Sequence, residues 1–367
     1  MYLVFINVKL KNSFLSVVRQ GIGHSSEPIE EISDWKALKA LADEHGLSAV
    51  VLDGLEKVNM NQPRLMKSMT QGMRLGWIGE VLQNYESRYA VYENAIASLA
   101  GFYRQHGINM MVLKGYACSL DWPKPNHRPC GDIDIWQFGK HKEADEALAR
   151  QMGIQVDTSH HKHTTFNWHG ITVENHYDFV NIHSHKSNRD LENIFEDLGK
   201  DDTHYIEVGG EKVFLPSANL HALFLIRHMS GHFAAERITL RQVLDWAFFV
   251  EKHSEEINWE WLEGILEEFG MKKLYDVLNA ICVGDLGFDV NIFNRVQFDP
   301  SIKDRVVNEI LSPEFSIEPP SGLFKRIIFK LRRWKGNEWK HQLCYKDSMW
   351  SAFWSGVWNH LLKPSSI

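Results

Sequence analysis

The stretch Gly131-Asp132-Ile133-Asp134-Ile135-Trp136 decides the fold, because its polar and apolar residues alternate as in a half-buried β-strand. Successive side chains of a strand point to opposite faces, so the two aspartates leave one face while the two isoleucines enter the other. Carboxylates one strand repeat apart can hold hard divalent cations, which take oxygen ligands. The same pattern also arises by chance in solvated loops and edge strands, so its neighbours must decide between the two interpretations.

A second strand pair supplies a third carboxylate. Residues 163–177 predict a β-hairpin that turns at His169-Gly170. Counting outward from this turn places Thr165 opposite Glu174 and His163 opposite His176, while the other face of the hairpin is apolar. Glu174 then has the position expected of a third metal ligand or a general base. A surface glutamate on a half-exposed sheet is the alternative.

Two further features are typical of phosphate binding. Lys114-Gly115 follows the apolar run 108–113 and precedes a short helical segment. Backbone N–H groups at a helix start bind phosphate, glycine allows close approach, and lysine adds a point charge. Arg128 precedes Asp132 in a proline-bounded loop and can clamp a phosphate with two hydrogen bonds. A plain turn and a structural salt bridge are the alternatives.

Together these segments resemble a known family. The order Leu113-Lys114-Gly115, then Arg128-Pro129-Cys130-Gly131-Asp132-Ile133-Asp134, then Val173-Glu174-Asn175-His176 resembles the bacterial uncharacterised nucleotidyltransferase family, which belongs to the DNA polymerase β-like nucleotidyltransferase superfamily. The resemblance runs from about residue 30 to 260 and includes His228 and the helical segment 240–246.

The resemblance implies an α+β fold, in which a small mixed-sheet nucleotidyltransferase core is flanked by N- and C-terminal helical regions. It implies Asp132, Asp134 and Glu174 as catalytic residues and ligands of Mg²⁺ or Mn²⁺. We expect the nucleotide to be held by Lys114, Gly115, Arg128, Gly131 and His176. The wider superfamily has a Gly-Ser pair where this chain reads Lys114-Gly115-Tyr116, so the serine that contacts the terminal phosphates is missing.

We therefore expect an enzyme that moves a nucleoside monophosphate from an NTP, such as ATP, to an acceptor hydroxyl and releases pyrophosphate. Small molecules, RNA ends and protein side chains all remain open as acceptors. The missing serine favours an alternative, a non-catalytic nucleotide-binding or scaffold protein that keeps the fold.

Bulk properties set the organisation of the chain. We expect three regions: N-terminal helices in 1–105, the α/β core in 106–216, and C-terminal helices in 217–367. The net charge of −7 argues against a protein that coats nucleic acid. The four cysteines show no CxxC pair, and we find neither a signal peptide nor a membrane-spanning run, so we expect a cytoplasmic protein.

Two helical patterns outside the core carry charge or histidine. His228 and His232 are spaced four apart on one helix, and we expect structural or supporting roles for them. Residues 324–341 combine an apolar stripe with Lys and Arg. We expect this basic tail to dock its stripe on the core. The functional alternatives are binding of nucleic acid, of an anionic membrane surface or of an acidic partner, and among these we favour a basic groove for RNA.

Overall fold

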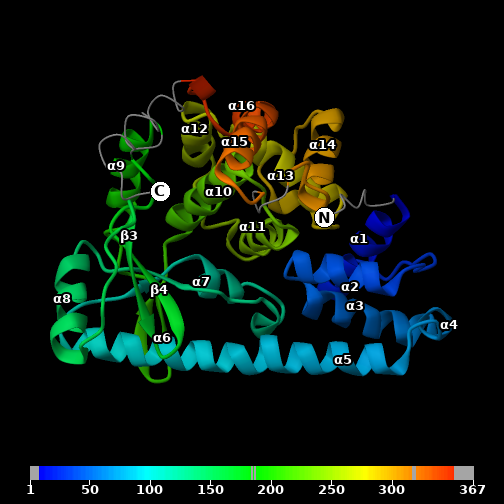
Figure 1. Ribbon diagram of the computed structural model, residues 1–367, viewed down its shortest axis with the longest axis horizontal. Helices are drawn as coiled ribbons and strands as arrows, with labels where there is room; N and C mark the ends of the chain where they lie inside the picture. Colours follow the sequence, from blue (N-terminus) through cyan, green and yellow to red (C-terminus); the bar gives the residue numbers. More distant parts are fainter. Residues whose placement is uncertain (1–7, 183–184, 186, 316–319, 351–367) are drawn as a thin grey trace.

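The computed structural model describes residues 8–182, 185, 187–315 and 320–350. It has the α+β fold that the sequence predicts, with a six-stranded mixed sheet between two groups of helices (Figure 1). No helix among the described residues is long and apolar enough to cross a membrane.

The N-terminal helices end in a long rod. They are α1 (Val8–Ile22), α2 (Trp35–Glu44), α3 (Ser48–Asn61), α4 (Pro63–Met66), α5 (Gln71–Val81) and α6 (Arg88–Gln105). A π-helical segment, Leu82–Ser87, joins α5 to α6 without a break. Figure 1 shows the resulting rod beneath the whole molecule, with α2–α4 over one end and the sheet over the other.

The sheet has the strand order β3-β4-β2-β1-β6-β5. The strands are β1 (Met111–Val112), β2 (Ile133–Trp136), β3 (His163–Trp168), β4 (Ile171–His176), β5 (Tyr205–Val208) and β6 (Glu211–Phe214). β2 pairs in parallel with β4 and antiparallel with β1. The predicted hairpin register is confirmed, because Thr165 pairs with Glu174 and His163 with His176. The expected strand at 108–113 is shorter than predicted, since only Met111 and Val112 pair.

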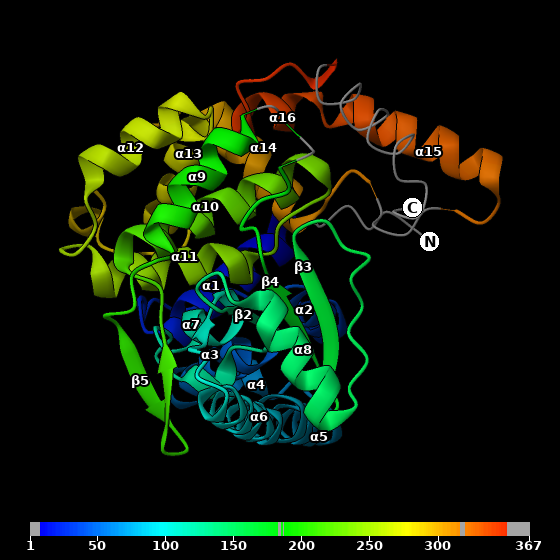
Figure 2. The ribbon, with the colours of Figure 1, turned by 90° about the vertical axis from the view of Figure 1, so that its left-hand side faces the viewer.

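Shorter helices connect and flank the strands. They are α7 (Lys114–Ser119), α8 (His141–Met152), α9 (Asn188–Leu198) and the 3₁₀ turn Pro125–His127. Figure 2 shows α8 in front of the sheet and the rod end-on below it.

The two faces of the sheet meet different partners. Ile133 and Ile135 pack with Tyr92, Ile96 and other apolar side chains of α6 in one cluster. The face that carries Asp134 points away from this cluster, towards the C-terminal helices. On β2, the alternation read from the sequence therefore separates an apolar face, with Ile133 and Ile135, from the face that carries Asp134.

The C-terminal helices are α10 (Ala218–Ala235), α11 (Leu240–His253), α12 (Trp259–Glu268), α13 (Lys272–Gly284), α14 (Pro300–Leu311), α15 (Leu323–Gly336) and α16 (Glu338–Cys344), with a 3₁₀ turn at Val290–Ile292. Their buried apolar residues form one cluster with those of α1–α3. The N- and C-terminal helices thus share one core. The division into three domains stays a prediction.

The apolar stripe of α15 is not docked as expected. Phe324 is 75% exposed and Leu331 is 50% exposed, and Ile327 and Ile328 are exposed as well. Figure 2 shows α15 extending outward from the other C-terminal helices. The helix itself is confirmed, but docking of its stripe on the core is wrong for the described residues.

Candidate active site

Three carboxylates converge at the polar face of the sheet. Asp132 stands directly before β2, Asp134 lies on β2, and Glu174 lies on β4 in register with Asp134. Parallel neighbouring strands bring such paired side chains to the same face. One carboxylate oxygen from each residue lies within 4.8 Å of the others, which is a distance over which a metal ion can be shared.

Lys114 neutralises part of this charge. It opens α7 with a left-handed backbone (φ +38°), and its Nζ lies 2.6 Å from Oδ1 of Asp134. Burial by itself lowers the pKa of Lys114, but the charges of Asp134 and Glu174 outweigh it and raise that pKa. The lysine therefore stays protonated against the carboxylates.

His176 approaches the same carboxylate from β4. Its Nε2 lies 2.9 Å from Oδ1 of Asp134. Burial by itself raises the pKa of Asp134, but the charge of Lys114 and the hydrogen bond with His176 hold it well below its ordinary value. The pKa of Asp132 is raised, first by burial and then by the charges of Asp134 and Glu174. The pKa values of Asp132 and Asp134 are therefore shifted in opposite directions, although the sequence pattern alone does not distinguish the two residues.

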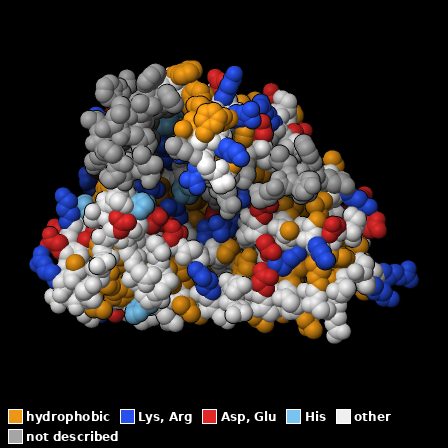
Figure 3. Space-filling model, in the orientation of Figure 1, with side chains coloured by type: hydrophobic (Ala, Val, Ile, Leu, Met, Phe, Trp, Pro, Cys, Tyr) orange, Lys and Arg blue, Asp and Glu red, His pale blue; other side chains and the backbone are white. Residues whose placement is uncertain are grey.

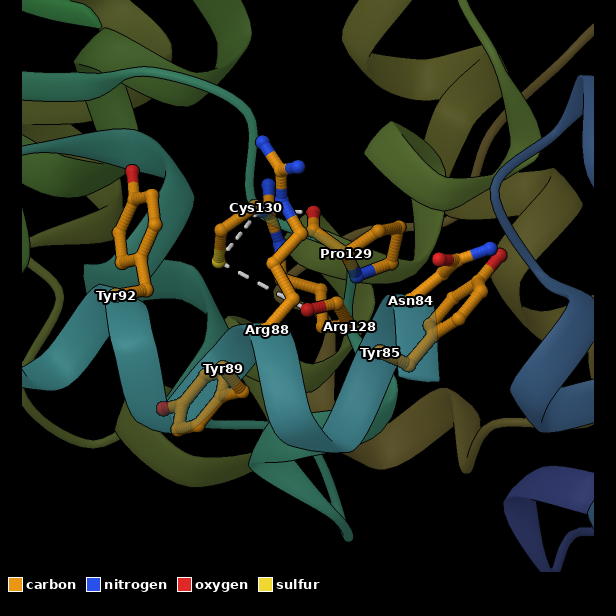
Figure 4. Close-up of a pocket in the computed structure, with 8 residues that line it drawn as sticks. All are labelled: Asn84, Tyr85, Arg88, Tyr89, Tyr92, Arg128, Pro129 and Cys130. Atoms are coloured by element: carbon orange, nitrogen blue, oxygen red, sulfur yellow. Dashed lines mark hydrogen bonds between the residues drawn. The ribbon is translucent and has the colours of Figure 1, made fainter. Parts of the chain in front are cut away.

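Arg128 is engaged elsewhere. Its Nε and Nη2 donate to Oδ1 and Oδ2 of Asp245 on α11, at 2.9 and 2.8 Å, and both side chains are buried. The structural salt bridge is therefore present, and a direct contact of Arg128 with phosphate stays a prediction. Figure 4 shows the residues that line a small pocket at this loop, among them Arg128 and Cys130 of the loop and Tyr89 and Tyr92 of α6.

The two glycines of the expected nucleotide site lie beside the carboxylates in sequence or in space. A Cβ on Gly131 would meet no atom within 4 Å, and one on Gly115 would meet only ordinary contacts, the nearest at 3.6 Å from the Asp132 carbonyl oxygen and the Tyr92 hydroxyl. Packing does not require glycine at either position, so their predicted roles towards a nucleotide remain predictions.

The site contains cationic and imidazole groups that sequence reasoning missed or set aside. Lys162 precedes β3 and is half-buried. Burial and then the charge of Lys114 lower its pKa, while Asp134 and Glu174 act in the opposite direction. Lys162 therefore interacts electrostatically with Lys114, Asp134 and Glu174, although no sequence motif predicted it as a site residue.

α10 adds histidine to this side of the site. Burial and then the charge of Lys114 lower the pKa of His228 well below its ordinary value, so this ring is neutral. The rings of His228 and His232 lie 4.4 Å apart. In Figure 3 the surface is hollowed where the sheet region meets the C-terminal helices, and Lys and Arg side chains show in this hollow.

Comparison with known proteins identifies the family of the chain. A crystal structure of an antigenic nucleotidyltransferase-like protein from Paracoccidioides brasiliensis is similar to this chain at 11% sequence identity and a TM-score of 0.35, covering 55% of this chain and 96% of that one. Such a distant likeness assigns neither function nor substrate. No curated protein matches the chain. The family described as "Uncharacterised nucleotidyltransferase" matches residues 31–283, a range that contains all three carboxylates. The chain belongs to this uncharacterised nucleotidyltransferase family.

Proposed function

We propose that the protein is a metal-dependent nucleotidyltransferase that moves a nucleoside monophosphate from an NTP to an acceptor hydroxyl and releases pyrophosphate. The observation that carries the proposal is the convergence of Asp132, Asp134 and Glu174. Carboxylates this close repel one another when ionised, and Lys114 supplies one positive charge against the three of them. A divalent cation would balance the remaining negative charge.

The residues fit oxygen-binding cations of the Mg²⁺ or Mn²⁺ type, since the trio offers only carboxylate oxygens. Such ions would supply activation of the hydroxyl and stabilisation of the leaving pyrophosphate. The acceptor oxygen bonds to the α-phosphorus, the bond from that phosphorus to the pyrophosphate oxygen breaks, and the acceptor proton passes to a base. Glu174 either accepts this proton or completes a metal site.

The triphosphate would lie on the cationic side of the cluster. Lys114 and Lys162 provide charge there, next to His228 of α10. Gly131 leaves open space for the nucleotide beside the strand, and the backbone of Gly115 would approach it at the start of α7. Arg128 would act indirectly, by tying the loop that leads into β2 to α11 through Asp245. Positioning and charge neutralisation then supply most of the rate enhancement.

A non-catalytic nucleotide-binding protein is the second candidate, favoured by Tyr116. This residue stands where the wider superfamily carries serine, and its hydroxyl is turned to Glu93, to which it donates at 2.9 Å. Tyr116 is buried, so its hydroxyl replaces no phosphate contact.

One experiment separates these two functions. The purified protein is incubated with each α-³²P-labelled NTP and Mg²⁺ or Mn²⁺ in a cell lysate, and label transfer to RNA, protein or small molecules is measured. Asp132→Asn is the test variant, since this half-exposed carboxylate has no buried ion-pair partner to leave behind among the described residues. Glu207→Gln, an exposed carboxylate on β5, is the matched control.

Transfer by wild type and Glu207→Gln, reduced at least about 100-fold in Asp132→Asn, is the expected result. Absence of transfer by the wild type, together with measurable NTP binding, would establish the non-catalytic candidate instead.

We also propose that α15 contacts an anionic lipid surface. Its exposed Phe324, Ile327, Ile328 and Leu331 share the helix with six cationic residues and no acidic one. An RNA would use the charges and stack a base on Phe324, but it would leave the aliphatic Ile327, Ile328 and Leu331 unused, whereas a membrane interface uses all of them.

A further inference from the structure

A second group of possible metal ligands lies beside the three carboxylates. His163 on β3 and His176 on β4 are Cα partners in the hairpin, and Glu174 is the next residue of β4 on the same face. One ligand atom from each lies within 4.8 Å of the others. The group offers two imidazole nitrogens and one carboxylate oxygen, a different chemistry from the all-oxygen trio.

The ring of His176 is oriented as a metal ligand would be. Its Nδ1 lies 3.2 Å from the carbonyl oxygen of Asp178, and since a carbonyl only accepts, Nδ1 donates. Nε2 then faces Oδ1 of Asp134 at 2.9 Å and Oε2 of Glu174 at 3.5 Å, so an ion bound by Nε2 would replace its hydrogen bond to Asp134. Metal-binding histidines commonly donate their second ring N–H to a backbone carbonyl in this way, which fixes the ring and the nitrogen that binds the ion.

His163 supplies the independent sign of a ligand. Its side chain is only 8% exposed, and its Nδ1 is buried without a hydrogen-bond partner among the described residues. Oε2 of Glu174 lies 3.4 Å from this nitrogen. Leaving a buried polar nitrogen of this kind without a partner is unfavourable, and a bound cation would satisfy it.

We propose that His163, Glu174 and His176 bind a divalent transition-metal ion such as Zn²⁺ or Co²⁺, next to the position of a Mg²⁺-type ion at Asp132 and Asp134. Imidazole with carboxylate suits transition metals, whereas Mg²⁺ takes oxygen ligands. Glu174 belongs to both groups, so the two ions share a ligand and are chemically unlike. The link of this ion to nucleotide transfer rests on the proposed function, but its binding does not.

Binding of Co²⁺ tests the site without any assay of activity. The full-length protein is titrated with Co²⁺ in excess Mg²⁺, and the visible absorption of the bound ion is recorded. We expect one equivalent to bind and to resist Mg²⁺. His163→Gln should weaken binding by more than about 100-fold, because loss of a direct ligand exceeds the 10–100-fold typical of supporting residues.

Three further variants assign the ion. Asp132→Asn, which alters only the all-oxygen trio, should keep the Co²⁺ spectrum, and His169→Asn at the exposed turn of the same hairpin is the matched control. His176→Asn repeats the test if circular dichroism shows that His163→Gln is unfolded. Displacement of Co²⁺ by Mg²⁺, no binding at all, or a spectrum lost in Asp132→Asn and kept in His163→Gln would each overturn the proposal.

Failure of the proposed function is distinguishable from failure of this site. A protein that transfers no nucleotide can still bind Co²⁺ through His163. A protein that transfers nucleotide with Mg²⁺ alone, with Co²⁺ binding unaffected by His163→Gln, would retain the proposed function and lose this inference.

Discussion

Arg128 and Asp245 form a two-point ion pair that joins the loop before β2 to helix α11. Nε and Nη2 of Arg128 lie 2.9 and 2.8 Å from the two oxygens of Asp245, and the side chains are 7% and 4% exposed. Trp122 also donates to Asp245, at 2.9 Å. The strand that carries the aspartates is therefore held against the C-terminal helices by a buried charge pair.

Loss of this pair should be costly to stability. Asp245→Asn leaves the guanidinium of Arg128 buried without its counter-charge, and we expect the free energy of unfolding to fall by about 3–5 kcal/mol. Urea denaturation followed by tryptophan fluorescence measures it. Glu44→Gln breaks the more exposed ion pair with Arg237 and is the control, with a change below about 1 kcal/mol. A similar small loss in both variants would contradict the prediction.

Lys162→Met should weaken binding of nucleotide in proportion to its phosphates. The charge of a lysine that contacts the triphosphate strengthens binding of ATP and hardly affects binding of adenosine. We therefore expect the affinity for ATP to fall about 10-fold, or by about 1.4 kcal/mol, and the affinity for adenosine to stay almost unchanged. Isothermal titration calorimetry measures both. Lys212→Met, on β6 against the ring of Tyr205, is the matched control. Equal losses for ATP and adenosine would show that Lys162 acts on the fold instead.

His45 should make the protein sensitive to acid. It is 1% exposed, its Nδ1 accepts from the backbone N–H of Leu240 at 3.1 Å, and burial lowers its pKa to about 3. Between pH 6.5 and 3, His45 is protonated in the unfolded chain but neutral in the folded chain. Its contribution to the free energy of unfolding is therefore fully present above the unfolded pKa and is lost as pH falls.

His45→Asn keeps an acceptor but does not titrate in this range. The fall in unfolding free energy between pH 7 and pH 4.5 should therefore be smaller than in the wild type by about 2 kcal/mol, since one pKa unit corresponds to about 1.4 kcal/mol. Urea denaturation at several pH values tests it, with His169→Asn as a control that keeps the wild-type pH dependence. An unchanged slope in His45→Asn would refute the assignment.

The basic helix α15 should bind anionic vesicles. Sedimentation with vesicles of phosphatidylcholine and phosphatidylserine should retain the wild-type protein, and vesicles of phosphatidylcholine alone should not. Phe324→Ser with Leu331→Ser should reduce retention about 10-fold, because the buried apolar area on the membrane is lost. Val290→Ser, which alters an exposed apolar residue elsewhere, should change nothing. Retention that ignores either the lipid charge or the double substitution would refute the contact.

Structural features that depend on residues close together in the chain could be predicted from the sequence. The hairpin of β3 and β4 has the predicted register, because a tight turn and an alternation of period two leave one pairing that buries its apolar face. The same alternation predicted which face of β2 carries the aspartates. Both inferences need only residues close together in the chain.

Long-range pairings could not be read in this way. Arg128 and Asp245 are 117 residues apart, and nothing near either one indicates the other. Lys162 reaches the site only because β3 begins there, and its own neighbours are polar loop residues. An amphipathic stripe such as that of α15 suits docking on the core and also a partner outside the chain, so the sequence pattern alone could not decide between them.

The rod of α5 and α6 fixes the rotation, about its own axis, between a side chain that contacts the N-terminal helices and one that contacts the segment before β2. Trp77 in α5 donates to the carbonyl oxygen of Ser48 in α3, and the hydroxyl of Tyr92, in the first half of α6, donates to the carbonyl oxygen of Asp132. Each residue added to a helix turns the remainder of that helix by about 100°. Insertion of a single residue between Trp77 and Tyr92 would therefore turn one of these side chains away from its hydrogen-bond partner. The number of residues between them thus determines how the segment with the aspartates is oriented relative to the N-terminal helices.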